Sequence, residues 1–227
     1  MKKHTYTLIA LGILAGPLAF SFEPQIHFWT HWPALFAATL VVGLVFVVWD
    51  VLVVKHGHWN FNPEWTGTWR LFGLPLGEYL FFLTVPYAMI FVYEAFRFLL
   101  PDRMLFHGEA SGLYVFSALA IAAAAIWHRQ GYTVLALVSA AVFLTTTGLE
   151  RSALVGTSGF WVYMIFGFAA FGLVNGVYTS LPTIHYAPKA IWGVRIGTIP
   201  LEDFFYNLSY LGLLLDFYSI FRALGLP

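Results

Sequence analysis

Two short motifs hold three of the acids that could do chemistry. The segments 74–79 (LPLGEY) and 199–204 (IPLEDF) align without a gap at an offset of 125 residues. Proline suits the first position of a helix, and an acid in the first turn interacts favourably with the helix dipole. Either motif alone could therefore be a helix start. Two copies in a chain with only 11 Asp and Glu residues favour a functional site that contains Glu78, Glu202 and Asp203.

Each motif has polar companions that repeat with it. Arg70 and Arg195 each stand five residues before the proline of their motif, and Asp50 corresponds to Asn175 at the same offset. If the helices around them cross a membrane, ionisable groups there are costly, and each is a functional hypothesis by default. Asp50 alone could also extend to a nearby interface. We expect all four residues to surround the acids.

Aromatic side chains stand close to the acids in both motifs, and those three or four residues further on share a helix face with them. They are Tyr79, Phe82, Phe205 and Tyr206, and Phe81 and Phe204 extend the cluster. Packing explains any one ring. In a dry aromatic cavity, however, a carboxylic acid stays protonated and acts as a general acid, while ring faces stabilise a developing cation. The helix N-terminus and the arginines favour the ionised form instead, and the sequence leaves this balance open.

The remaining acids and the histidines indicate no second site. Glu94 and Asp216 lie near the far ends of their segments, and Arg97 follows Glu94 by three residues, so we expect both acids at an interface. The 8 histidines fall in loops or at helix ends, which argues against a transmembrane haem or metal site. The absence of cysteine excludes disulfides, thiolate metal sites and thiol nucleophiles.

The elements that must position these residues are membrane helices. A composition of 60% hydrophobic and 10% charged residues is too apolar for a soluble domain of 227 residues. A spanning helix needs about 20 mostly apolar residues. We predict an all-α integral membrane protein with seven transmembrane helices, near residues 5–21, 33–54, 76–100, 112–127, 132–148, 159–180 and 200–223.

The offset of 125 residues extends beyond the motifs and predicts an internal repeat. It brings Phe61 onto Tyr186 and Pro63 onto Pro188, and the first three helices onto the last three. Four helices, an even number, precede the second half, so both halves cross the membrane in the same direction. The motifs then begin helices on one face. We predict two parallel three-helix repeats, at 1–105 and 131–227, joined by a linking helix at 106–130.

The distribution of Lys and Arg predicts the orientation. With the N-terminus inside, the cytoplasmic side holds Lys2, Lys3, Lys55, Arg70, Arg129, Lys189 and Arg195, and the other side holds Arg97, Arg103, Arg151 and Arg222. We therefore expect a multi-pass protein of the plasma membrane with a cytoplasmic N-terminus. The basic start and the apolar run to Phe20 lack a small-x-small cleavage site, so we interpret them as the first helix. A net charge of zero gives no indication of nucleic-acid binding.

These motifs resemble a known family, the small membrane lycopene cyclases. Such proteins occur as two-subunit enzymes in some bacteria, as fused single chains in other bacteria and archaea, and as the cyclase part of fungal fused enzymes. Their three-helix units each carry a Pro-x-Glu-Glu/Asp motif before aromatic residues, and the runs at 74–82 and 199–205 occupy those places. Asp50 and the segment Trp59–Asn62 also resemble the first unit. The first motif departs from the pattern at Gly77, which argues against a mechanism with an acid pair from each half.

The resemblance implies cyclisation of linear lycopene to a β-ionone end ring. A terminal double bond is protonated, the ring closes through a tertiary carbocation, and a proton is lost without net oxidation. The implied proton donor is Glu202 or Glu78, with the second motif preferred, and Asp203 is its partner or the base. Asp50, Asn175, Arg70 and Arg195 surround them, and Tyr79, Phe82, Phe205 and Tyr206 stabilise the cation. We expect no cofactor and no metal, and the chain has no Gly-x-Gly-x-x-Gly motif.

Some alternatives stay open. Within the family, the substrate could be a C50 carotenoid or the product an ε-type ring. A seven-helix retinal protein is disfavoured because residues 200–223 contain no Lys for a Schiff base. A small proton-coupled transporter would also use membrane acids, although parallel repeats without discontinuous helices count against it. The expected partners are a linear carotenoid and membrane lipids. The sequence leaves open whether one or both ends are cyclised, how the polyene enters, and the oligomeric state.

Overall fold

Seven long helices make up most of the fold in the described part of the chain. The computed structural model describes residues 2–106, 110–149 and 153–227, so His107 and Arg151 lie outside the described residues. The long helices are α1 (Thr5–Phe20), α2 (Trp32–Lys55), α4 (Leu76–Leu99), α5 (Ala110–Ile126), α6 (Gly131–Leu149), α7 (Ser158–Ser180) and α8 (Leu201–Ala223). Each begins and ends within two residues of an expected span.

Five segments of the described chain are long and apolar enough to cross a membrane, which confirms the prediction of a helical membrane protein. They are Phe28–Lys55, Leu76–Leu99, Gly131–Leu149, Ser158–Ser180 and Leu201–Ala223. The helices α1 and α5 are shorter, at 16 and 17 residues. Large apolar side chains on the outer faces, such as Leu40 and Leu173, are exposed, as expected where lipid is the solvent.

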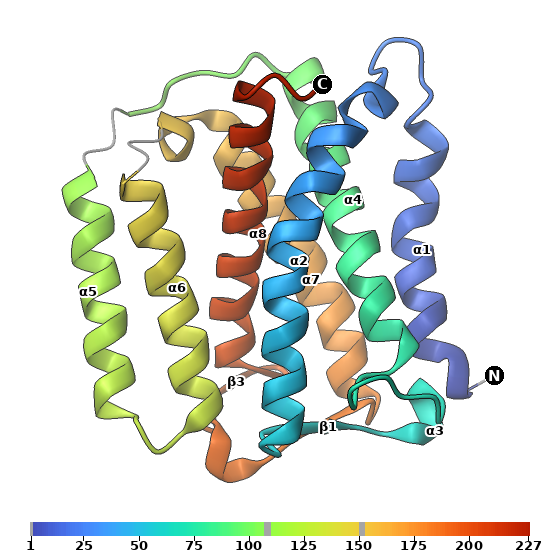
Figure 1. The fold of residues 1–227 in the computed structure, drawn as a ribbon, viewed down its shortest axis with the longest axis vertical. Coiled ribbons are helices and arrows are strands. Elements are labelled where there is room, and N and C mark those ends of the chain that lie inside the picture. Colours follow the sequence, from blue (N-terminus) through green and yellow to red (C-terminus); the bar gives the residue numbers. More distant parts are fainter. Residues whose placement is uncertain (1, 107–109, 150–152) are drawn as a thin grey trace.

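The helices run side by side, and their directions alternate along the chain. In Figure 1, α1, α4, α6 and α8 begin at the lower end, where α2, α5 and α7 finish. The helices α4 and α8 contact each other; α1 packs on α4 and α6 on α8, while α7 packs on α4 and α2 on α8. The helix α5 packs on α6 and lies at the edge of the bundle. The two helices that carry the acid motifs are therefore neighbours in the middle of the bundle.

Short strands cover the lower end of the bundle. The strand β1 (Trp59–Phe61) pairs antiparallel with β2 (Ile184–Tyr186), so that Trp59 faces Tyr186, Asn60 faces His185 and Phe61 faces Ile184. Two short helices, α3 (Pro63–Thr66) and η4 (Pro188–Ala190), follow these strands. The remaining 3-10 turns are η1 (Lys2–His4), η2 (Phe28–His31) and η3 (Ala153–Gly156).

A tight turn precedes each motif helix. The strand β3 (Arg195–Ile196) pairs with β4 (Ile199–Pro200) directly before α8, and a single bridge joins Leu71 to Leu74 before α4. Gly73 and Gly197 in these turns have φ values of 90° and 63°, a left-handed conformation that glycine adopts without steric cost. Each turn is followed by a proline, Pro75 or Pro200, that is the N-cap residue of the following helix.

Small residues let the central helices approach closely. A methyl group added at Gly212 in α8 would collide with the ring of Phe143 in α6, and one at Gly167 in α7 would meet Leu211 in α8 and Met89 in α4. Close backbone approach at small residues is the usual mode of helix packing in membranes. These contacts hold α4 and α8 in fixed relation to α6 and α7.

Candidate active site

The two motif helices bring one acid from each half of the chain into the same cavity. Glu78 lies in the first turn of α4 and Asp203 in the first turn of α8, and both are buried. The two helices begin at the same end and contact each other, so both carboxyl groups line one cavity of about 60 Å³. Strand residues Phe61 and Tyr186 also line it, and β1 lies at the lower end of the bundle (Figure 1), so the β1–β2 pair forms part of the cavity wall at that end.

In the first half of the chain, two carboxyl groups face each other. The hydroxyl of Tyr6 in α1 donates a hydrogen bond of 2.5 Å to Oε2 of Glu78. The carboxyl groups of Asp50 in α2 and Glu78 lie within hydrogen-bond range of each other. The hydroxyl of Tyr206 lies 3.4 Å from Oδ1 of Asp50. Because a carboxylate has no donor, two carboxyl groups bond to each other only when one is protonated. The Asp50–Glu78 pair is thus built to hold a proton.

In the second half, the equivalent acid is surrounded by donors. Asp203 accepts hydrogen bonds from the hydroxyl of Tyr132 at 2.6 Å, from that of Tyr186 at 2.7 Å and from Nδ2 of Asn175 at 2.9 Å. Hydrogen bonds donated to a carboxylate favour its charged form. The exchange of Asp50 in one half for Asn175 in the other therefore makes the two acids chemically different.

Glu202 lies elsewhere. Its Oε1 accepts hydrogen bonds from Oγ1 of Thr133 at 2.6 Å and from the backbone N–H of Trp192 at 2.5 Å. It is fully buried, but it is not among the described residues that line the acid cavity. Its counterpart in the first half is Gly77, where a side chain would collide with the ring of Tyr6.

The two arginines that precede the motifs have different surroundings. Arg70 donates to the carbonyls of Gly67 and Trp69 and to Oγ1 of Thr66, and so ties the loop before α4 together. The guanidinium of Arg195 lies over the ring of Tyr186, 5.6 Å from its centroid. Burial and the neighbouring Asp203 raise the pKa of Tyr186 well above its usual value, so this phenol stays protonated as a donor. Arg195 therefore reaches the site only through Tyr186, and Arg70 supports the loop.

Of the four rings expected beside the acids, Tyr206 alone lines the acid cavity in the described part of the chain. Tyr79 donates to the carbonyl of Leu71, Phe82 is buried in the core against Tyr210, and Phe205 faces the ring of Trp192. Other rings also line the cavity, among them Phe81, Phe171 and Tyr210. Helical spacing did not predict which face of each motif helix lines the acid cavity.

The sequence did not identify Tyr6 and Tyr132, whose hydroxyls donate hydrogen bonds to Glu78 and Asp203 respectively. These tyrosines lie at equivalent places on α1 and α6, but they are 126 residues apart. Comparison at a constant offset of 125 therefore aligned neither with the other. Allowing a one-residue gap between the first and second helices of each half would have revealed the pair.

The acids outside the cavity have partners of their own. Glu94 is 3.4 Å from Arg97 and accepts a hydrogen bond of 2.7 Å from Tyr218. Asp216, expected at an interface, is instead buried between α8 and α6, where Thr147 donates to it at 2.5 Å. No group of three His, Cys, Asp or Glu residues within the described ranges could hold a metal ion.

The cavity thus combines two buried carboxyl groups from the first half, a carboxyl group with three donors from the second half and several ring faces. Such an arrangement can give a proton on one side, take one on the other and stabilise positive charge between them.

Searches among curated proteins and solved structures find no significant match. A family model described as lycopene cyclase matches residues 3–96 and 129–221. These two segments cover most of the chain and contain both motif helices. The chain therefore belongs to the lycopene cyclase family.

Proposed function

We propose that this protein is a lycopene β-cyclase in which Glu78, paired with Asp50, donates the proton and Asp203 receives it. The observation that carries the proposal is the chemical difference between two acids that line one cavity. Two buried carboxyl groups, Asp50 and Glu78, line the cavity from the first half, where like charge favours retention of a proton, whereas Tyr132, Tyr186 and Asn175 all donate to Asp203. This difference favours an acid on one side and a base on the other.

The reaction balances without an external reactant. Glu78 transfers its proton to the terminal double bond of lycopene, a C–H bond forms, and the broken π bond leaves a tertiary cation. The electrons of a second double bond close the ring and move the positive charge into it. Asp203 then removes a ring proton, and a new double bond forms. The product is an isomer, and the proton returns across the cavity from Asp203 to the Asp50–Glu78 pair.

Ring faces and the exclusion of water support this chemistry. Phe81, Tyr206 and Tyr210 line the cavity, and the face of an aromatic ring attracts a nearby cation. Water would trap the cation as an alcohol, so the site must stay dry. The buried position of both acids and the cover formed by β1 and β2 are consistent with this requirement.

We also propose that residues 1–105 and 131–227 are two parallel three-helix repeats, linked by α5 in 106–130. The pairing of β1 with β2 supports this. Asn60 pairs with its own equivalent, His185, while Trp59 pairs with the equivalent of Phe61 and Phe61 with the equivalent of Trp59, as expected about a twofold axis.

With the N-terminus in the cytoplasm and the chain in the plasma membrane, the acid cavity lies near the cytoplasmic face. The end that carries η1, η4 and β3 holds Lys2, Lys189 and Arg195, as the positive-inside rule requires.

The experiment is expression in a bacterium that accumulates lycopene, followed by pigment chromatography. The wild-type chain should convert lycopene to γ- or β-carotene. Glu78→Gln and Asp203→Asn should each leave lycopene, whereas Glu94→Gln, an acid of α4 outside the cavity, should behave like the wild type. An ε-type ring would keep the mechanism but change the product. Unchanged lycopene with well-expressed wild-type protein would overturn the proposal.

A further inference from the structure

A second, apolar cavity adjoins the acid cavity. It has a volume of about 280 Å³ and is lined by residues of α1, α4, α7 and α8. Five residues line both cavities, namely Phe81, Phe171, Asn175, Tyr178 and Asn207. The two spaces are therefore neighbours that share a wall at the level of the acids. An apolar molecule in the larger space could present its tip to the carboxyl groups.

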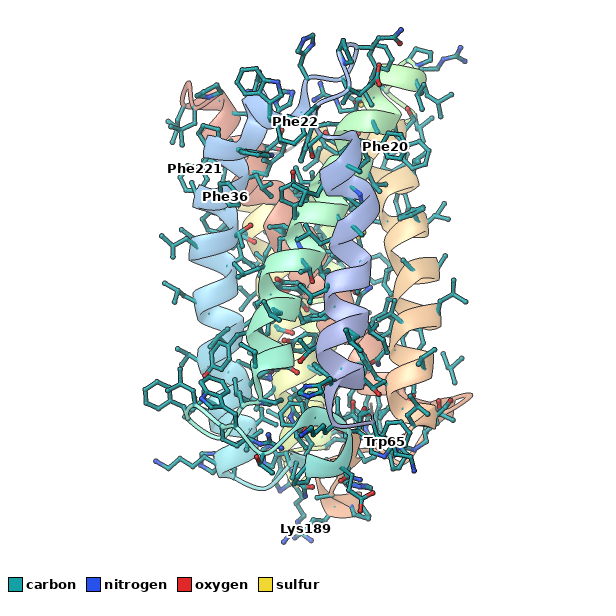
Figure 2. All side chains as sticks on the ribbon, turned by 90° about the vertical axis from the view of Figure 1, so that its right-hand side faces the viewer. Phe20, Phe22, Phe36, Trp65, Lys189 and Phe221 are labelled. Carbon is teal, nitrogen blue, oxygen red and sulfur yellow. The ribbon has the colours of Figure 1, made fainter. Side chains whose placement is uncertain are left out.

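The apolar cavity lies between α1 and α7. These helices meet at their lower ends, where the rings of Tyr6 and Tyr178 stack with centroids 4.2 Å apart. Further along, Ile13 and Pro17 of α1 and Ala170 of α7 line the cavity. Phe166, which also lines it, is 41% exposed on the outer face. A side chain that lines the cavity is thus also exposed on the lipid-facing surface, on the side of the bundle where Figure 2 shows α1 in front of α4 with α7 beside it.

The internal repeat allows this side of the bundle to be compared with its counterpart between α2 and α6. Lining residues Val85, Ala88, Gly167, Ala170 and Val174 correspond, at an offset of 125, to Tyr210, Leu213, Val42, Val45 and Trp49. All five counterparts are larger. Four lining positions have clearly smaller counterparts at this offset: Phe166, Tyr178 and Leu211 fall on Val41, Val53 and Pro86, and Ile13 falls on Val138. The small residues that leave room for the cavity are thus concentrated on one side of the twofold arrangement.

We propose that this cavity is the binding lane for the polyene chain of a linear carotenoid, which enters from the bilayer between α1 and α7. The inference rests on the proposed function and specifies where its substrate lies. The acid cavity of about 60 Å³ has room for only a few water-sized groups. The rest of the end group must therefore occupy the adjoining apolar space, and only the terminal double bond reaches the acids.

A single lane has a consequence for the order of products. One end of lycopene occupies the acid cavity while the rest of the rigid chain extends through the α1–α7 opening towards lipid. The second end cannot react until the molecule leaves and enters again in the opposite sense. The monocyclic carotenoid is therefore a released intermediate and precedes any bicyclic product.

The test compares Ala170→Phe with Val45→Phe, its matched control at the equivalent position of α2. Val45 is 59% exposed and lies on the side without small residues, so Val45→Phe should cyclise like the wild type. Ala170→Phe should reduce cyclised pigment at least tenfold at equal protein in the membrane. In liposomes, Ala170→Val and Ala170→Leu should raise the half-saturating lycopene concentration in order of side-chain size.

Full activity of Ala170→Phe, or equal losses in both phenylalanine variants, would overturn the lane. If Ala170→Phe fails to accumulate, the valine and leucine variants decide. A time course of the wild type gives a second measurement: monocyclic pigment should appear first and exchange with added lycopene. Bicyclic product that forms without free monocyclic pigment would also overturn the lane. If the wild type leaves lycopene unchanged, the proposed function fails rather than the lane.

Discussion

The ring of Tyr6 occupies the space that a side chain at Gly77 would need. The same tyrosine donates its hydroxyl to Glu78, the next residue of the motif. Glycine at position 77, where the motif pattern has an acid, is therefore a structural requirement of this chain. A larger residue there would displace Tyr6, the hydrogen-bond donor to Glu78. In the second half, Tyr132 donates to Asp203 although an acid, Glu202, precedes Asp203. The two halves therefore place the donor tyrosine beside different residues, Gly77 in one and Glu202 in the other.

Gly77→Ala tests this relationship directly. The added methyl group must displace the ring of Tyr6, and overpacking of this kind costs about 1–3 kcal/mol. We expect lower thermal stability in detergent and a loss of cyclisation. Gly12→Ala on α1 is the control, since nothing lies within 4 Å of the added methyl there. Equal behaviour of the two variants would show that Tyr6 has room to move.

Asp50→Asn removes the proton-sharing partner of Glu78. Losing general acid catalysis typically costs on the order of 10²–10⁴-fold in rate, and we expect a drop in that range in a liposome assay with lycopene. The reciprocal change Asn175→Asp places a second carboxyl group beside Asp203 and removes one of its three donors, so it should also reduce the rate. An active Asp50→Asn variant would exclude the carboxyl pair as the proton source.

Substitutions at Tyr206 separate the ring from its hydroxyl. The 3.4 Å contact from the hydroxyl to Asp50 is long, so Tyr206→Phe should change the rate little. Tyr206→Leu removes the ring face, and a cation–π contribution of about 1–2 kcal/mol corresponds to roughly five- to thirtyfold in rate. Rates measured in liposomes for both variants decide the matter. A leucine variant as active as the phenylalanine variant would exclude cation stabilisation by this ring.

Tyr186 provides a prediction about pH. Burial and Asp203 raise its pKa well above the usual 10.0, so the folded protein holds this proton more tightly than the unfolded chain. Its contribution to stability is then fully present below about pH 10 and disappears only as the pH rises through the higher folded value. We expect the difference in melting temperature between wild type and Tyr186→Phe to stay constant from pH 7 to 9. A difference that shrinks across this range would show that the phenol ionises normally.

The helices could be predicted well from the sequence because a membrane-spanning helix is recognised by the length and apolar composition of its segment. The equivalence of Glu78 and Asp203 also followed from the sequence, since rare acids stand at one offset. The tyrosines that donate to these acids could not be identified in the same way. Their role depends on which face of α1 and α6 turns towards α4 and α8, and tyrosine is common in this chain, with 12 copies.

Side-chain direction also limited the prediction of the cation-stabilising rings. Tyr79 and Phe82 both stand within four residues of Glu78, yet neither is among the described residues that line the acid cavity, whereas Phe81 is. A helix turns about 100° per residue, so neighbours of an acid point in different directions. The inward face of α4 is decided by its contacts with α1, α2, α7 and α8, most of which involve distant parts of the chain.

Glu202 and Asp203 are adjacent acids for which the structure indicates opposite outcomes. Glutamine at position 202 can still accept the hydrogen bonds from Thr133 and Trp192 through its amide oxygen. Its amide nitrogen would replace Oε2, which has no hydrogen-bond partner among the described residues. Glu202→Gln should therefore fold and cyclise lycopene within a fewfold of the wild type, whereas Asp203→Asn should be inactive at the same membrane level. If instead Glu202→Gln is inactive and Asp203→Asn is active, the proton passes through Glu202, and the cavity lined by Glu78 and Asp203 is not the reaction site.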